Sequence, residues 1–200
     1  MSTVILIGGP TACGKTTFTR HLEKVIPNSI SFRRVDGFYE LGKERGIKNI
    51  FQEISSKEVD EYFLKKCKRE EVVLSDVHYA VQLRKETEYV PTISQELLDK
   101  LKENGIEVIA IYLDCSPETC LERETIRFKN TGKPKRNSSL KEATQEQQSE
   151  KEKWEDVCSH DFVKGILLNS ELFLPEELGK IAIQEWKKKG KSFIKDRNDL

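Results

Sequence analysis

The amino-acid sequence predicts an α/β fold of three layers, in which helices cover both faces of a five-stranded parallel sheet. Five predicted strands alternate with segments of helical periodicity, which is the pattern of repeated strand–helix–strand units. The first of them, residues 3–7, is apolar almost throughout, which fits a parallel strand buried on both faces. The 200 residues suit a single domain. The predicted strands are residues 3–7, 29–35, 71–76, 106–113 and 163–169.

Start and stop signals delimit the helices between these strands. Ser94 and Ser116-Pro117 are N-terminal capping signals, whereas Ile26-Pro27 and Gly105 mark C-terminal ends. Residues 77–92 carry charged pairs and a proline and are predicted to form a loop. The predicted helices are a segment that starts at Asp36-Gly37 and residues 17–25, 54–69 (capped by Ser55 or Ser56), 94–104, 116–128, 140–157 and 175–188.

The composition narrows the partners and the compartment. Lys plus Arg and Asp plus Glu both number 34, so no global basic field attracts nucleic acid or an acidic membrane. The basic run at residues 187–191 is interpreted as a solvated chain end, and the tail after Gly190 is predicted to fray. The five scattered cysteines form no disulfide framework and no C-x-x-C zinc pair. Because the chain begins with a strand and has no long apolar run, we expect a cytoplasmic protein without a membrane partner.

The segment from Gly9 to Thr16 reads G-x-x-x-x-G-K-T and lies between the first strand and the first helix. Its glycines permit a tight turn whose successive N–H groups point at a phosphate, and the helix N-terminus adds its dipole. Lys15 supplies a cation, and the Thr16 hydroxyl is a ligand for Mg²⁺. The segment therefore predicts binding of a nucleotide or a similar polyphosphate. The predicted nucleotide-binding residues are Gly9, Pro10, Thr11, Ala12, Cys13, Gly14, Lys15, Thr16 and Thr17.

Polar residues follow the other strands at the edge where parallel sheets bind ligands. Asp36, Asp76 and Asp114 all fall there. In phosphate-loop proteins, a carboxylate at the end of a neighbouring strand completes the Mg²⁺ shell, so Asp76 is predicted to act with Thr16. The alternative is a strand-end residue that suits a turn. His78 is predicted to touch an acceptor or to orient a carboxylate, and its alternative is a structural role.

A basic stretch follows the fourth strand. Arg123 and Arg127 are four residues apart and share one helical face, and the loop that follows carries Arg136. The helix at residues 140–157 is polar almost all round, as in a solvent-facing element. We predict that residues 123–157 form a lid whose arginines neutralise charge on a transferring phosphoryl group. The alternative is a solvated helix with intrahelical salt bridges.

This layout resembles the small P-loop kinases of the nucleoside monophosphate kinase group, and archaeal-type adenylate kinases in particular. The similarity extends over much of residues 3–170 and depends on motifs and spacing. The family usually supplies an arginine for the acceptor phosphate in a region where this chain has few arginines past Arg45. The motifs that carry the resemblance are the phosphate loop, Val35-Asp36-Gly37-Phe38, Asp76-Val77-His78, Tyr89-Val90-Pro91 and the arginine-bearing helix before the lid.

The resemblance implies phosphoryl transfer from ATP, with Mg²⁺ bound near Thr16 and Asp76. It implies an acceptor-binding insertion at about residues 36–70 and a small-molecule acceptor such as a nucleoside monophosphate. The implied catalytic residues are Lys15, Asp76, Arg123, Arg127 and Arg136. The implied acceptor-binding residues are Asp36, Gly37, His78 and Tyr89.

Two other functions fit parts of the sequence. The loop also resembles that of tRNA dimethylallyltransferases, in which Asp36 would be the base, but that class is usually much longer than 200 residues. The second alternative is a switch or assembly factor that hydrolyses ATP slowly. A guanine-specific switch is excluded because the sequence lacks the N-K-x-D motif.

Overall fold

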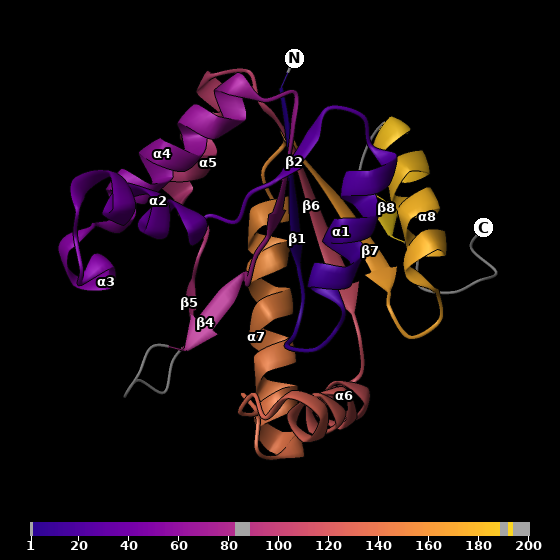
Figure 1. Cartoon of the computed structure of the whole chain (residues 1–200). Coiled ribbons are helices and arrows are strands. Elements are labelled where there is room, and N and C mark those ends of the chain that lie inside the picture. The colour runs from indigo at the N-terminus through magenta and orange to yellow at the C-terminus, as the bar shows by residue number, and fades with distance from the viewer. Residues whose placement is uncertain (1, 83–88, 189–191, 194–200) are drawn as a thin grey trace.

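The structure, a computed structural model, describes residues 2–82, 89–188 and 192–193. Its main sheet contains β1 (Thr3–Gly8), β2 (Ser29–Ser31), β3 (Val72–Asp76), β6 (Glu107–Asp114), β7 (Val163–Asn169) and β8 (Ser192–Phe193). The strands run parallel in the order β2-β3-β1-β6-β7-β8 (Figure 1). The predicted five-stranded parallel sheet is confirmed. The short strand β8, which has two residues, pairs with β7 as a sixth strand at the edge of the sheet.

Helices cover both faces of this sheet, as the sequence predicts. The helices are α1 (Lys15–Val25), α2 (Asp36–Arg45), α3 (Ile50–Glu53), α4 (Ser56–Arg69), α5 (Gln95–Glu103), α6 (Pro117–Thr131), α7 (Leu140–Cys158) and α8 (Pro175–Lys187). Serines cap several of them, and Ser55 forms a capping box with Glu58 at the start of α4. None of the helices in the described part of the chain has the length and hydropathy that crossing a membrane requires.

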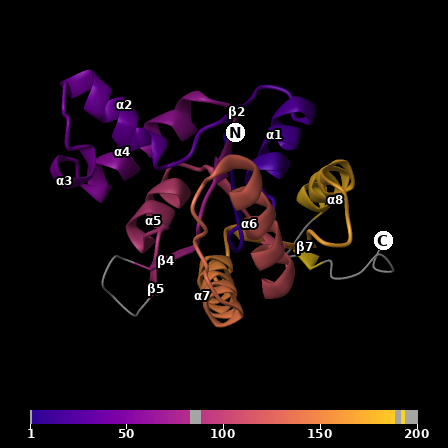
Figure 2. The same cartoon turned by 60° about the horizontal axis from the view of Figure 1, so that its bottom comes forward.

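The central strand β1 divides the hydrophobic core into two halves. Val4 and Leu6 face the half that contains side chains of α4, α5 and α7, whereas Ile5 and Ile7 face the half that contains α1 and α8. All six residues of β1 are buried, which explains why this run is apolar without alternation. The carboxyl ends of β1, β3 and β6 meet at one edge, and α6 lies across that edge (Figures 1 and 2).

Two segments differ from the predicted elements. Residues 77–92, predicted as a loop, contain the antiparallel pair β4 (Ala80–Gln82) and β5 (Tyr89–Pro91). These strands are too short to give a periodic signal. The second predicted strand ends at Ser31 rather than at residue 35, because the chain turns where the Asp36 carboxylate accepts a hydrogen bond from the Arg33 amide. Of the predicted tail after Gly190, only residues 192–193 lie within the described part of the chain.

Helix α7 is not the solvent-facing helix that the sequence predicts for residues 140–157. One of its faces packs along the sheet and buries the Trp154 side chain, whose Nε1 donates to the Ala110 carbonyl at 2.9 Å. The prediction was wrong because two members of the buried face, Glu146 and Glu150, are carboxylates that count as polar in any hydrophobic pattern. Since α7 belongs to the core, the lid proposal narrows to the C-terminal half of α6 and residues 132–139.

Candidate functional site

The phosphate loop, residues 9–14, connects β1 to α1 through backbone conformations that side chains disfavour. Gly9 has a φ of 139°, and a Cβ there would lie 2.4 Å from the carbonyl oxygen of Leu113. Gly14 has a φ of 105° and precedes the first turn of α1. The first-turn amides of a helix have no acceptor within that helix, so the loop presents donors to an anion at the helix N-terminus.

The Lys15 side chain is buried and folds back over the loop. Its Nζ donates to the carbonyl oxygens of Gly9, at 2.6 Å, and of Pro10, at 3.0 Å. Burial raises the pKa of the neighbouring Cys13 thiol to about 11, even though Lys15 favours the thiolate. Cys13 is therefore a small packed residue of the loop rather than a reactive thiol.

Thr16 and Asp76 meet as the sequence predicts. Asp76 ends β3 beside β1, and the Thr16 Oγ1 donates to Asp76 Oδ2 at 2.8 Å. A hydroxyl and a carboxylate are the hard oxygen donors that Mg²⁺ takes, usually together with phosphate oxygens and water. This pair therefore fits the metal, which would neutralise charge on the bound phosphates.

The phosphate cavity, of about 590 Å³, opens above this pair and receives residues from distant parts of the chain. It brings together most of the predicted nucleotide-binding and catalytic residues. It adds Arg33, which the sequence analysis missed, together with Val35 of the motif quoted for the family resemblance and Lys133 of the basic loop in the predicted lid. Among the described lining residues several side chains are cationic and only Asp76 is a carboxylate. The cavity therefore favours an anion. It is lined by Thr11, Ala12, Gly14, Lys15, Thr16, Thr17, Arg33, Val35, Asp76, His78, Arg123, Arg127 and Lys133.

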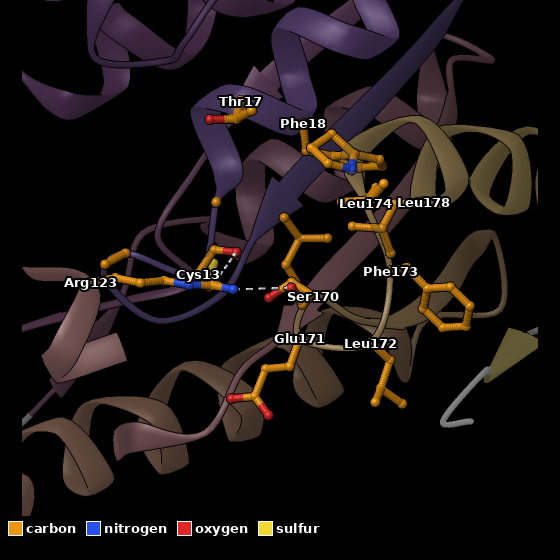
Figure 3. A pocket seen from close by; sticks show the side chains of 14 residues that line it. Cys13, Thr17, Phe18, Arg123, Ser170, Glu171, Leu172, Phe173, Leu174 and Leu178 are labelled. Atoms are coloured by element: carbon orange, nitrogen blue, oxygen red, sulfur yellow. Dashed lines mark hydrogen bonds between the residues drawn. The ribbon is translucent and has the colours of Figure 1, made fainter. Parts of the chain in front are cut away.

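A second cavity, of about 510 Å³, is also lined by Arg123 (Figure 3). Its walls are largely apolar and include Leu172, Phe173 and Leu174 from the loop after β7. The Arg123 guanidinium donates to the Ser170 carbonyl at 3.3 Å and lies 3.5 Å from the Cys13 carbonyl, and its side chain lines both cavities. We name this space the base cavity. The strand-end argument that identified Asp76 applies equally to residues 170–174 and could have found them.

Arg127 lines the phosphate cavity and is paired on one side only. Its Nη2 lies 3.1 Å from the buried Glu124 carboxylate, which also accepts from the amides of Arg136 and Asn137. Its Nε is buried and has no hydrogen-bond partner among the described residues. A buried donor without an acceptor is costly, and a phosphate oxygen in the cavity is an acceptor of the right kind.

Arg136, the third predicted lid arginine, does not line the phosphate cavity. Its Nε lies 3.2 Å from Glu146 Oε1, and its Nη1 lies 3.2 Å from His78 Nε2. Glu146 also accepts hydrogen bonds from the Thr11 hydroxyl at 2.7 Å and from the side-chain amide of Asn137 at 2.6 Å. This buried carboxylate therefore ties the basic loop to the phosphate loop.

The His78 side chain contacts a glutamate of α7. Its Nδ1 lies 2.5 Å from Glu150 Oε1, and the other oxygen of Glu150 accepts from the amides of Tyr79 and Ala80. Burial raises the pKa of Glu150 to about 8 and lowers the pKa of His78 to about 3. Both groups therefore favour their neutral forms near pH 7.

The carboxylates of α7 have the donor atoms of a metal site, because atoms of His78, Glu146 and Glu150 lie within 4.8 Å of one another. However, their oxygens already accept hydrogen bonds, and the Arg136 guanidinium lies among them. We therefore interpret the group as a network of hydrogen bonds and ion pairs that connects α7 to the phosphate loop and the basic loop, rather than as a metal site. The sequence analysis missed both glutamates, although their spacing with Ala143 and Trp154 repeats at three to four residues, which is a helical face.

The other predicted acceptor-binding residues do not line the phosphate cavity. Asp36 forms an ion pair with Arg33. The Arg33 side chain lines the phosphate cavity, whereas Asp36 does not. Gly37 packs on α4, where a Cβ would lie 3.1 Å from Val59. Tyr89 is half-buried in β5, and burial, together with the nearby Glu146 carboxylate, raises its pKa.

Comparisons with known proteins place the chain in a family. The model of the AAA domain family matches residues 5–155. The similar solved structures include the tunicamycin resistance protein of Deinococcus radiodurans, at 14% identity over 94% of this chain and 96% of that chain, with a TM-score of 0.57. They also include shikimate kinase of Acinetobacter baumannii in complex with shikimate, at 19% identity over 92% of each chain, with a TM-score of 0.54.

A third similar structure is deoxyadenosine kinase of M. mycoides with products bound, at 15% identity over 92% of this chain and 98% of that chain, with a TM-score of 0.51. At such identities the likeness shows the shared P-loop kinase-like fold. No curated protein matches the sequence. Because the family model spans three quarters of the sequence, from the phosphate loop through α6 and most of α7, the chain belongs to the AAA domain family.

Proposed function

We propose that the protein is a phosphotransferase that binds MgATP and moves the γ-phosphoryl group to a small acceptor. The observation that carries the proposal is the order of three cavities along one edge of the sheet. The base cavity adjoins the phosphate cavity at the phosphate loop and Arg123, which line both. On its far side the phosphate cavity shares Val35, Asp76 and His78 with a further cavity of about 320 Å³, which we name the acceptor cavity.

This order matches the parts of a transfer reaction. The apolar base cavity suits a nucleobase, and the phosphate cavity suits the polyphosphate. The acceptor cavity then holds the nucleophile on the opposite side of the phosphates, as in-line transfer requires. Two structures with the same fold are named as kinases, of shikimate and of deoxyadenosine, which supports this chemistry. The family resemblance adds nucleoside monophosphates to the candidate acceptors.

Each group of the phosphate cavity then has a role. Thr16 and Asp76 would hold Mg²⁺, which supplies charge neutralisation to the phosphates when bound. Lys15 contacts the outer phosphates, and Arg123 and Arg127 stabilise the charge of the transferring group. His78 orients the acceptor from the wall that the two cavities share. Arg136 reaches the phosphates only if the 132–139 loop closes and releases its contacts with Glu146 and His78.

A phosphoryl-acceptor screen with labelled ATP tests the function. The panel contains nucleosides, nucleoside monophosphates, sugars and small hydroxy acids, and ADP release is measured with and without each acceptor. We expect one class to raise ADP release and to become labelled. ADP release that no acceptor changes would favour the ATP-hydrolysing switch. A mass shift of tRNA with a prenyl diphosphate would instead favour the transferase alternative.

The Arg127→Ala variant tests the role of α6 in the transition state. We expect kcat to fall on the order of a hundredfold, because the variant removes a charge from a desolvated site. The affinity for ATP should stay within a few-fold, because the contact is made fully only during transfer. Lys129→Ala is the matched control, since Lys129 is an exposed cation on the same helix. Steady-state kinetics and calorimetry of MgATP binding separate the two quantities.

Amide hydrogen exchange of residues 132–139 provides an independent measurement. If these residues close over the phosphates, their protection should rise when a bisubstrate analogue binds. Full activity of Arg127→Ala, together with exchange that no ligand alters, would show that this region is a solvated charged helix and loop rather than a lid.

A further inference from the structure

The acceptor cavity has mainly apolar walls. Its walls come from residues 34–38, from the end of β3 and the segment that follows it, from β4 and from residues 92–93. It shares Asp76 and His78 with the phosphate cavity. Its volume of about 320 Å³ matches a ring-sized molecule rather than a second large phosphate-bearing group. The lining residues are Arg34, Val35, Phe38, Asp76, Val77, His78, Val81, Thr92 and Ile93.

The guanidinium in this wall is already neutralised. Arg34 forms a close ion pair with Asp60 of α4, and the two side chains are only 18% and 11% exposed. The arrangement is braced on both sides, since Arg34 Nη2 donates to the Ser56 carbonyl and the Ser94 hydroxyl donates to Asp60, each at 3.3 Å. Opening such a pair would leave a buried carboxylate without its cation, which is strongly unfavourable.

Arg33, which lines the phosphate cavity, is also paired with a carboxylate. Arg33 donates to both oxygens of Asp36, with Nη2–Oδ1 at 2.7 Å and Nε–Oδ2 at 3.2 Å. The cations around the ATP phosphates differ, because Lys15 and Arg123 are hydrogen-bonded mainly to neutral carbonyl oxygens and keep their net charge. The positive charge of the site is thus concentrated on the side of ATP.

From this distribution of charge we infer that the acceptor is an uncharged hydroxyl compound with an apolar, ring-sized body, such as a nucleoside, and not an anion such as a nucleoside monophosphate. The inference rests on the proposed function and narrows its substrate class. An anionic acceptor in this cavity would meet the Asp76 carboxylate and an Arg34 guanidinium that already has its partner. An uncharged ring would instead bury its surface against Val77, Val81 and Ile93.

The transfer step balances without a further reagent. The acceptor hydroxyl oxygen forms a bond to the γ-phosphorus of ATP. The bond from that phosphorus to the bridging oxygen breaks, ADP leaves with the electron pair, and the hydroxyl proton passes to water.

Matched acceptor pairs test the inference. Each of adenosine, guanosine, cytidine, uridine and deoxyadenosine is compared with its 5′-monophosphate, and shikimate and gluconate serve as small hydroxy acids. We expect at least one uncharged member to exceed its anionic partner by roughly tenfold or more in kcat/KM, a difference of about 1.4 kcal/mol. Faster transfer to the monophosphates or to the acids would overturn the inference and leave the kinase function standing. If no acceptor raises ADP formation, the proposed function fails and the inference fails with it.

The Asp60→Asn variant tests the charge argument directly. Removing this carboxylate frees the charge of Arg34, so the preference for uncharged over anionic acceptors should fall by about tenfold. Glu61→Gln, at an exposed position of the same helix, is the matched control. An unchanged preference in a folded Asp60→Asn variant would contradict the inference.

The double variant Arg34→Gln with Asp60→Asn keeps the test valid if the single variant does not fold, because it leaves no unpaired charge. Because this variant frees no net charge, its ratio of kcat/KM for the uncharged to the anionic acceptor should match the ratio of wild type. A fall of that ratio as large as the one in Asp60→Asn would show that the charge of Arg34 does not set the preference, and the inference would be wrong.

Discussion

Lys15→Ala should weaken MgATP binding by roughly ten- to a hundredfold, because one charge-assisted hydrogen bond to phosphate contributes about 1.5–3 kcal/mol. Lys15 is placed for this role by the loop itself. Its Nζ rests on the carbonyl oxygens of Gly9 and Pro10, at the mouth of the phosphate cavity. Isothermal titration calorimetry with MgATP measures the change.

Two controls make the result interpretable. Lys24→Ala removes an exposed cation from the last turn of the same helix and should leave the affinity unchanged. Because Lys15 also braces the loop, the thermal stability of Lys15→Ala must be compared with that of the wild type. Unchanged affinity for MgATP in a folded Lys15→Ala variant would disprove the assignment of the phosphate loop.

The parts of the site that local sequence determines were predictable. The phosphate loop specifies its own geometry, because Gly9 and Gly14 supply the two unusual backbone conformations and the helix that follows supplies the amides. The meeting of Thr16 with Asp76 follows from a general rule, since neighbouring parallel strands end at one edge. The central strands β1, β3 and β6 were predictable because they are buried and therefore read as short apolar runs.

The parts that depend on distant pairing were not predictable. Glu146 is 135 residues from Thr11. Its spacing with Ala143 and Trp154 marks a helical face, but no local pattern identifies the distant partner of a buried carboxylate. The pairing of Arg34 with Asp60 likewise depends on how α4 docks beside the sheet. Both contacts are ion pairs or hydrogen bonds of buried charges, which form only after the apolar faces have brought the elements together.

Asp76→Asn should lower phosphoryl transfer by on the order of a hundred- to a thousandfold, because the variant weakens the hold on the metal that neutralises the developing charge. Binding of ATP without metal should change little, since Asp76 acts on the metal rather than on the nucleotide. The amide retains an oxygen that can accept from Thr16, so the fold at this edge should persist.

Asp114→Asn is the matched control, because Asp114 also ends a strand at this edge, but its Oδ1 accepts a hydrogen bond from Gln147 Nε2 at 3.1 Å. The measurement is kcat as a function of Mg²⁺ concentration, together with calorimetry of ATP in the presence of a chelator. Wild type should saturate at lower Mg²⁺ than Asp76→Asn, and Asp114→Asn should follow wild type. If all three proteins showed the same turnover at limiting Mg²⁺, Asp76 would be a strand-end residue without a role in the metal site. The hydrogen bond between Thr16 and Asp76 would then serve only the fold. The proposal of phosphoryl transfer would depend on the order of the cavities alone.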